Sequence, residues 1–128
     1  MAAATEVPPI QASPAAWLGP EMAAQPERWT WALAAGEVAE VEAAADAFLA
    51  RGGGAAVLDA DAFQLPTLGP RLIALRRELI EGRGFELVQG LELHKWPREK
   101  AAAAFLGLGA HIGSARSQNA LGHLLGHV

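Results

Sequence analysis

The stretch at residues 82–90, Gly-Arg-Gly-Phe-Glu-Leu-Val-Gln-Gly, constrains the fold most, because a helical pattern ends and a strand pattern begins within it. Ahead of it, leucine and isoleucine recur at helical spacing, which predicts a helix over about 69–81. Gly82 stands where a left-handed C-terminal cap is expected. After it, the alternation over 85–89 predicts a strand. We expect this strand to begin a sheet whose other strands lie mostly outside this sequence.

Two further helices are expected, one on each side of this region. The first spans about 36–51, where Val41 and Phe48 belong to an apolar stripe. The second spans about 97–108 and has a proline near its first turn, where the missing N–H costs nothing. Its apolar contacts are expected from Phe105, Leu108 and Ile112. Helices and a strand in this order indicate an α+β fold.

The N-terminal region is rich in alanine and proline over residues 1–15, which we expect to form a weakly ordered arm. The segment 16–22 carries Trp17 between turn-forming residues and is expected to pack as a strap on the surface. Trp29 and Trp31 are two residues apart and share a face only if the chain is extended there. The burial habits of tryptophan favour core or strap anchors over a stacking platform.

Composition and charge exclude several classes of function. The chain of 128 residues has a net charge of −4, and its basic residues form no clustered stripe with interleaved aromatics, so a nucleic-acid partner is not expected. The absence of cysteine excludes disulfides and thiolate metal sites. No apolar run is long enough to cross a bilayer, and the first residues do not resemble a secretory signal. We therefore expect a cytoplasmic protein with no membrane partner.

The histidines are candidate metal ligands, and there are four of them, His94, His111, His123 and His127. The last two are four residues apart, a spacing that on a helix presents two imidazoles to one metal ion. Leu124 occupies the position where the metalloprotease motif requires glutamate, and neighbouring glycines disfavour a helix. Surface or hydrogen-bonded histidines are the favoured interpretation.

Other catalytic patterns are absent from the sequence. The non-haem iron motif usually appears as a histidine followed two residues later by an acid, and no histidine here has that neighbour. The serines lack the context of a nucleophile elbow. From its own residues the chain predicts no catalytic and no metal-binding residue.

Six segments carry a further signal. They are Ala-Trp-Leu-Gly-Pro at 16–20, Trp-Thr-Trp-Ala-Leu at 29–33, Phe-Gln-Leu-Pro-Thr-Leu at 63–68, Gly-Arg-Gly-Phe-Glu-Leu-Val-Gln-Gly-Leu at 82–91, Leu-Gly-Ala-His-Ile-Gly at 108–113 and Gln-Asn-Ala-Leu-Gly-His-Leu-Leu at 118–125. In this order and spacing they resemble the N-terminal part of the TauD/TfdA-like family, the taurine-dioxygenase type of iron(II)- and 2-oxoglutarate-dependent oxygenases. The resemblance covers nearly the whole chain from about residue 15.

The resemblance implies a double-stranded β-helix, a jelly-roll of the clavaminate-synthase-like type wrapped by helices. Residues 16–128 would supply its N-terminal helices and first strands, and stop before the iron-binding His-x-Asp. The family's iron and 2-oxoglutarate ligands have no matching positions here, so no catalytic, cofactor-binding or metal residue is assigned. Gln118 and Asn119 match the segment that leads toward the active site. The alternative, which the habits of asparagine favour, is that both are turn-forming residues bonded to their own backbone.

The leading hypothesis is therefore an N-terminal fragment of an Fe(II)/2-oxoglutarate-dependent dioxygenase, an oxidoreductase that is inactive in this form. Its partner would be the missing C-terminal portion. The alternative is a non-catalytic binding or oligomerisation module that binds a partner, such as an intact homologue, through an open sheet edge. A third hypothesis is one half of a split oxygenase.

Overall fold

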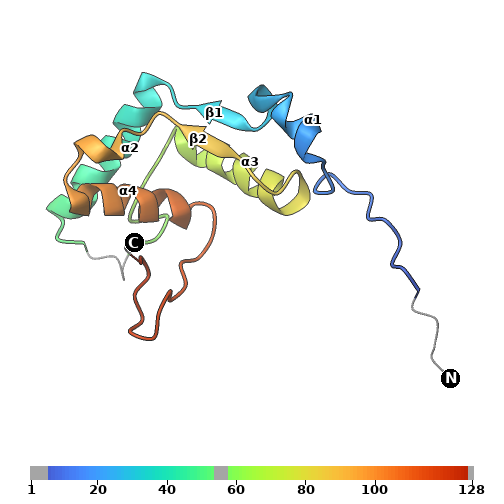
Figure 1. Ribbon diagram of the computed structural model, residues 1–128. Helices are drawn as coiled ribbons and strands as arrows, with labels where there is room; N and C mark the ends of the chain where they lie inside the picture. The colour runs from blue at the N-terminus through green and yellow to red at the C-terminus, as the bar shows by residue number, and fades with distance from the viewer. Residues whose placement is uncertain (1–5, 54–57, 127–128) are drawn as a thin grey trace.

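The computed structural model describes residues 6–53 and 58–126, which form an α+β arrangement of four α-helices and one small parallel sheet (Figure 1). The elements in chain order are α1 (Gly19–Ala23), the 3-10 turn η1 (Pro26–Arg28), β1 (Thr30–Ala32), α2 (Ala35–Ala50), α3 (Leu68–Glu81), β2 (Leu87–Gln89), the 3-10 turn η3 (Leu93–Lys95) and α4 (Arg98–Ala110). The three predicted helices are confirmed as α2, α3 and α4, each to within about two residues at either end. The predicted α+β class is confirmed.

The sheet consists of β1 and β2 in parallel, with Trp31 opposite Val88. Its ladder is continued at both ends by hydrogen bonds from the Leu87 N–H to the Trp29 carbonyl and from the Leu33 N–H to the Gln89 carbonyl, both 2.8 Å long. The strand expected over 85–89 is shorter than predicted. Two short strands do not make a jelly-roll, so within the described residues that part of the expected fold is not seen.

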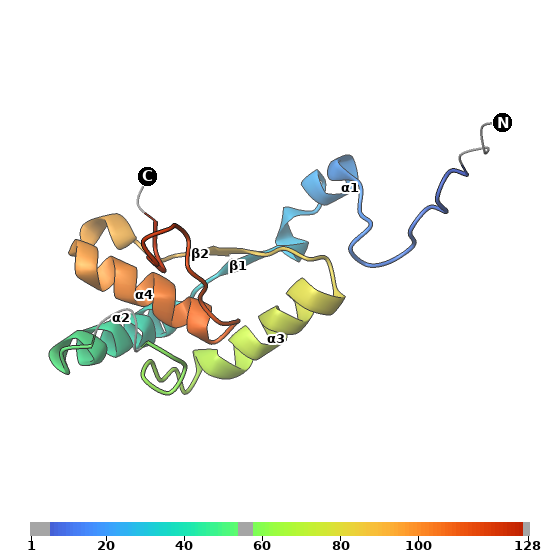
Figure 2. The ribbon, with the colours of Figure 1, turned by 90° about the horizontal axis from the view of Figure 1, so that it is seen from below.

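The helices lie mostly on one side of the sheet. Helix α3 runs beneath the two strands, and α2 and α4 pack side by side at one end of the sheet (Figures 1 and 2). Trp31 points toward α3 and is buried. Above the opposite face of the sheet, Figure 1 shows no helix or strand from the described part of the chain.

The core joins these helices through one cluster of buried apolar side chains. Its members are Trp31, Val41, Ala45, Phe48, Phe63, Leu65, Leu68, Leu72, Leu75, Ala103 and Ala104. Helix α4 contributes only small residues to it, and Gly107 lies directly under the ring of Phe63. The expectation that Phe105 packs inward is wrong, because its side chain is 61% exposed. Leu108 and Ile112 do pack against the core, as predicted.

The start of α3 is capped by a side chain of another helix. Thr67 stands at the cap position but makes no side-chain cap. Instead Glu40 of α2 accepts hydrogen bonds from the backbone N–H groups of Thr67 (2.9 Å) and Leu68 (3.0 Å). A carboxylate at this position satisfies free N–H groups and interacts favourably with the positive end of the helix dipole. This contact fixes α3 relative to α2.

The end of α3 differs from the prediction in its cap. Gly82 has φ −104° and is not left-handed. Gly84 is the left-handed residue, with φ +87°, and its N–H reaches back 3.2 Å to the Glu78 carbonyl. The N–H of Gly82 also donates to the Glu78 carbonyl, and the left-handed residue therefore lies two positions later than predicted. Gly90 follows the last residue of β2, has φ +114° and approaches Leu33 closely, so a side chain there would be strained.

The two ends of the chain lack regular structure where the structure describes them. Residues 6–18 are exposed, and the strap around Trp17 packs on Phe85 with ring centroids 4.9 Å apart, as expected of a strap. The tail from 117 to 126 contains a turn and no strand, while His127 and Val128 lie outside the described residues. No helix in the described part combines the length and apolar character needed to cross a bilayer.

The packing of Phe63 on α4 predicts opposite effects of two alanine substitutions in one helix. A Cβ at Gly107 would lie 2.6 Å from Cδ1 of the fully buried Phe63 ring, whereas a Cβ at Gly109 meets nothing within 4 Å. Gly107→Ala should lower the free energy of unfolding by about 1–3 kcal/mol through overpacking. Gly109→Ala should raise it by up to about 1 kcal/mol through helix propensity. Urea denaturation measures both, and a stabilising Gly107→Ala would contradict this packing.

Candidate functional site

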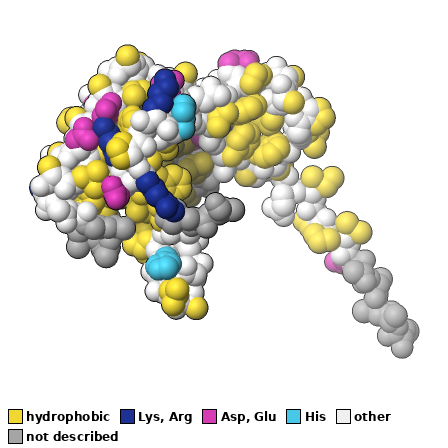
Figure 3. Space-filling view, turned by 60° about the vertical axis from the view of Figure 1, so that its left-hand side comes forward, with side chains coloured by type: hydrophobic (Ala, Val, Ile, Leu, Met, Phe, Trp, Pro, Cys, Tyr) yellow, Lys and Arg dark blue, Asp and Glu magenta, His cyan; other side chains and the backbone are white. Residues whose placement is uncertain are grey.

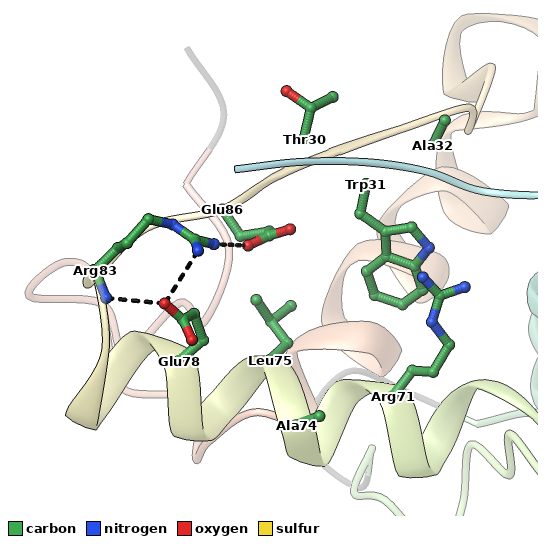
Figure 4. Close-up of a pocket in the computed structure, with 9 residues that line it drawn as sticks. All are labelled: Thr30, Trp31, Ala32, Arg71, Ala74, Leu75, Glu78, Arg83 and Glu86. Atoms are coloured by element: carbon green, nitrogen blue, oxygen red, sulfur yellow. Dashed lines mark hydrogen bonds and ion pairs between the residues drawn. The ribbon is translucent and has the colours of Figure 1, made fainter. Parts of the chain in front are cut away.

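One hollow lies between α3 and the inner face of the sheet. It is a cleft of about 420 Å³ (Figure 4). Its lining residues are Thr30, Trp31, Ala32, Arg71, Ala74, Leu75, Glu78, Arg83 and Glu86. Two arginines and two glutamates stand among them, so the formal charge of the lining is balanced and attracts neither anions nor cations as a whole.

Arg83 closes one end of this cleft by joining three segments of the chain. Its guanidinium forms an ion pair with Glu78 of α3 (3.1 Å) and a second one with Glu86 just before β2. Its backbone N–H donates to Glu78, and its carbonyl accepts from the Trp17 indole at 3.0 Å. Only 15% of the Arg83 side chain is exposed. These bonds position the turn between α3 and β2, which makes Arg83 a structural clamp.

The other end of the cleft is closed by Arg71, whose guanidinium lies 3.8 Å above the Trp31 ring, within cation–π range. Arg71 also forms an ion pair of 2.7 Å with Glu37, the third residue of α2. Glu37 accepts the Ala34 backbone N–H at 3.0 Å. This is one half of a capping box, because Ala34 has no side-chain acceptor to complete the other half.

The Glu37 carboxylate is held in its charged form by these donors. The Ala34 N–H, and after it the Arg71 guanidinium, lower the pKa of Glu37 below its usual 4.5, outweighing the opposite effect of burial. The buried Nε1–H of Trp31 adds a small effect of the same sign without meeting the geometry of a hydrogen bond. The group therefore stabilises the fold at neutral pH, and nothing in it indicates proton transfer.

A second hollow, of about 900 Å³, lies between the end of α4 and the loop that follows it. Its lining residues are Leu58, Asp59, Phe105, Leu106, Leu108, Gly109, Ala110, Ile112, Gly113, Ser114, Ala115, Arg116, Gln118 and Leu124. The lining is mainly apolar, with Asp59 and Arg116 as its charged members. Neither residue was singled out from the sequence, because no local motif surrounds them.

The predicted active-site-proximal residues, Gln118 and Asn119, lie on this loop and only Gln118 lines the hollow. The Asn119 Oδ1 accepts the backbone N–H groups of Leu121 (3.0 Å) and His123 (3.1 Å). The Gln118 Nε2 donates to the Arg116 carbonyl at 2.9 Å. Both side chains thus bond to their own loop, as in the turn-forming alternative. Their closeness to an active site stays a prediction.

The histidines do not converge on a metal position. His111 Nε2 lies 2.6 Å from the Phe63 carbonyl and must carry its proton, because a carbonyl can only accept. His123 is exposed and bonded to Asn119, His94 is exposed in η3, and His127 lies outside the described residues. The described residues contain no group of three or more histidine, cysteine, aspartate or glutamate side chains that could hold a metal ion. They do not fit an iron site.

Comparison with known proteins relates the chain to an oxygenase. No protein-family model matches it. It is 33% identical over 114 residues to the taurine hydroxylase-like protein SAT17 of Stachybotrys chartarum, a match that covers 88% of this chain. The chain is a distant homologue of a TauD-type oxygenase. The predicted relationship to this type of oxygenase is thereby confirmed as a distant homology, and the match spans 29% of the length of SAT17.

The Arg83 clamp predicts that this homologue of TauD-type oxygenases is sensitive to a charge-conserving substitution. Arg83→Lys keeps the charge but cannot donate to Glu78 and Glu86 with one fork. It should lower the free energy of unfolding by about 1–3 kcal/mol, the range for hydrogen bonds to charged groups. Arg77→Lys, on the exposed face of α3, is the matched control and should change it by less than about 0.5 kcal/mol. Equal effects in urea denaturation would refute the clamp.

The lowered pKa of Glu37 predicts that the protein loses stability toward unfolding in acid. Because its pKa is lowered in the folded state, its contribution is complete above the unfolded value of 4.5 and disappears as the pH falls through the folded value. Glu37→Gln should therefore be less stable than the wild type at pH 7, and the difference should shrink between pH 5 and about 2. Urea denaturation across this range measures it. Glu81→Gln is the control, and a pH-independent difference for Glu37→Gln argues against the assignment.

Proposed function

We propose that this chain is the N-terminal, non-metal-binding part of an Fe(II)- and 2-oxoglutarate-dependent dioxygenase. The observation that carries the proposal is the match itself: 88% of the chain aligns with only 29% of a taurine hydroxylase-like protein. The chain therefore corresponds to one portion of such an enzyme. Its described residues build a scaffold, and oxidation of a substrate belongs to the assembled protein.

The proposal assigns the cofactors to the remaining part of the enzyme. Iron and 2-oxoglutarate follow from the family, and the described residues of this chain have no ligand set for the metal. The helices and strands would instead pack against a double-stranded β-helix that carries the ligands. The short parallel pair, β1 and β2, is the portion of the present fold that could join such a sheet.

A second candidate function is a non-catalytic binding module, and one observation favours it. All three residues of β2 are exposed, including Leu87 at 44% and Val88 at 37%. An exposed strand edge can bind another chain by strand addition. Light scattering on the purified chain separates the two functions: a discrete homodimer, or a discrete complex with an intact homologue, supports the module. A split oxygenase would instead require a separately encoded iron-binding half.

The proposed function predicts that activity depends on the rest of the polypeptide. The isolated chain should neither bind Fe(II) in equilibrium dialysis nor form succinate from 2-oxoglutarate above a metal-free control. A chimera in which this chain replaces the matched segment of SAT17 should fold and bind Fe(II) as SAT17 does. In a control chimera, a Gly/Ser linker of the same length replaces the segment and should lose the cooperative fold.

Two outcomes contradict the proposal. One is succinate formation by the isolated chain, which would place the active site within it. The other is a chimera that does not fold while SAT17 itself does, which would mean that the chain is not equivalent to the segment it replaces.

A further inference from the structure

Helix α3 carries large apolar side chains on two opposite sides. Its inner side holds Leu68, Leu72 and Leu75, which are buried in the core. On its outer side, Ile73 is 53% exposed and Ile80 is 70% exposed. The two isoleucines are separated by nearly two full helical turns, so they lie on one face and form a continuous stripe. A helix that is apolar all round is normally buried all round, and α3 is covered on its inner side alone.

Helix stability gives no reason for isoleucine at these two positions. Its β-branched side chain loses rotamer freedom in a helix, so alanine, leucine or lysine would favour the helix more. A single exposed isoleucine is common on protein surfaces and needs no explanation. Two of them on one helical face form an apolar surface of the kind that packs against another helix, and we call this surface the Ile73–Ile80 stripe.

Two arginines flank the Ile73–Ile80 stripe. Arg76 and Arg77 are exposed, and at about 100° per residue they lie on opposite sides of the stripe. Within the described residues neither arginine takes part in an ion pair. The stripe is therefore bordered by two positive charges that nothing nearby balances. A complementary surface has to be apolar in its middle and negatively charged at its border.

The outer face of α2 has this chemistry. Three exposed alanines recur there at every fourth position, Ala39, Ala43 and Ala47. Beside this row, the carboxylates of Glu42 and Asp46 share a single ammonium group, that of Lys100, at 2.7 and 3.0 Å. One negative charge is therefore left over along the row of alanines. The Asp46 side chain is 59% exposed, so an arginine from outside can reach it.

The two faces also fit one another in shape. Helices pack by placing the side chains of one into the grooves of the other, and small residues on one helix leave room for large ones on its partner. Figure 3 shows another apolar area, where hydrophobic side chains gather over the part of the molecule from which the N-terminal segment extends. That area shows few charges in this view and so does not indicate what covers it. The arginines beside the Ile73–Ile80 stripe do indicate the charge of its partner.

We propose that the Ile73–Ile80 stripe of one copy of this chain packs on the outer face of α2 of a second copy, which makes the chain a dimer. This inference goes beyond the proposed function and does not depend on it. In a two-fold pair each copy supplies both faces, so the contact is made twice and the assembly is closed. The repetition matters because stable interfaces bury roughly 1,200–2,000 Å², more than a single pair of short helices provides.

Sedimentation equilibrium of the full chain over a wide range of concentrations measures the dissociation constant of this dimer. Ile73→Glu places a charge inside the apolar contact and should raise the dissociation constant at least about tenfold. Ile10→Glu is the matched control, because it makes the same change at an isoleucine that is 97% exposed in the N-terminal segment. It should leave the dissociation constant unchanged. Circular dichroism should show the same helix content for both variants, since neither side chain belongs to the core.

A charge exchange between the two faces tests the pairing itself. Replacing both arginines, in Arg76→Glu/Arg77→Glu, turns attraction to the acidic border of α2 into repulsion and should weaken the dimer at least about tenfold. Asp46→Arg alone should weaken it as well. Adding Asp46→Arg to the double variant should instead strengthen that variant's dimer, because opposite charges then face each other again. Such a reversal of sign is the signature of a direct contact.

Four outcomes overturn the proposal, and none of them touches the proposed function, which the Fe(II) binding of the chimera tests separately. One is a chain that stays monomeric at every concentration. Another is a dimer that Ile73→Glu leaves intact, as a dimer joined through the edge of β2 would be.

The other two outcomes replace the second copy by a different occupant. A monomeric chain whose Ile73→Glu change lowers the melting temperature of the SAT17 chimera alone assigns the stripe to the catalytic part. A monomeric chain that binds vesicles containing phosphatidylserine, and loses this binding in Arg76→Glu/Arg77→Glu, assigns it to an anionic membrane surface.

Discussion

The parallel pairing of β1 with β2 is the constraint on which the rest of the described fold depends. Parallel strands cannot be joined by a tight turn and need a long crossover, which α2 and α3 supply. A two-stranded sheet this short is marginal alone. It is held by contacts outside the ladder: Trp31 is buried toward α3, Arg83 ties the entry of β2 to α3, and Trp17 packs on Phe85. The strands are aligned by their surroundings more than by their own hydrogen bonds.

Small residues decide how the helices approach one another. Helix α4 turns Ala103, Ala104 and Gly107 toward the core, and Phe63 occupies the space that a larger side chain would take. Such a face buries little apolar area, at about 25 cal/mol per Å², but it permits close packing. Lys100 adds a polar tie to α2, where the hydrogen bond to Glu42 and the neighbouring Asp46 raise the pKa of the ammonium. The small side chains of α4 and the ion pairs of Lys100 with Glu42 and Asp46 therefore determine how α2 and α4 pack together.

The sequence predicted the positions of the helices better than it predicted which side of each helix is buried. Helical periodicity located α2, α3 and α4, because it depends only on local spacing. Periodicity placed Phe105 inside, because large apolar residues normally mark the buried face of a helix. In the alanine-rich helix α4 the face with small side chains is buried instead, because the ring of Phe63 packs against it. The left-handed residue is Gly84 and not Gly82, since the Glu78 carbonyl accepts from both glycines. Neither outcome is visible without the tertiary contacts. The hollow beside Gln118 likewise depends on a loop fold that no local pattern encodes.

The segments that carry the family resemblance coincide with the contacts that hold the scaffold. Trp17 donates to Arg83, Phe85 receives the Trp17 ring, and His111 donates to the carbonyl of Phe63. These residues belong to four different segments of the six. In this protein these residues thus serve packing, whereas the described residues have no metal-binding group.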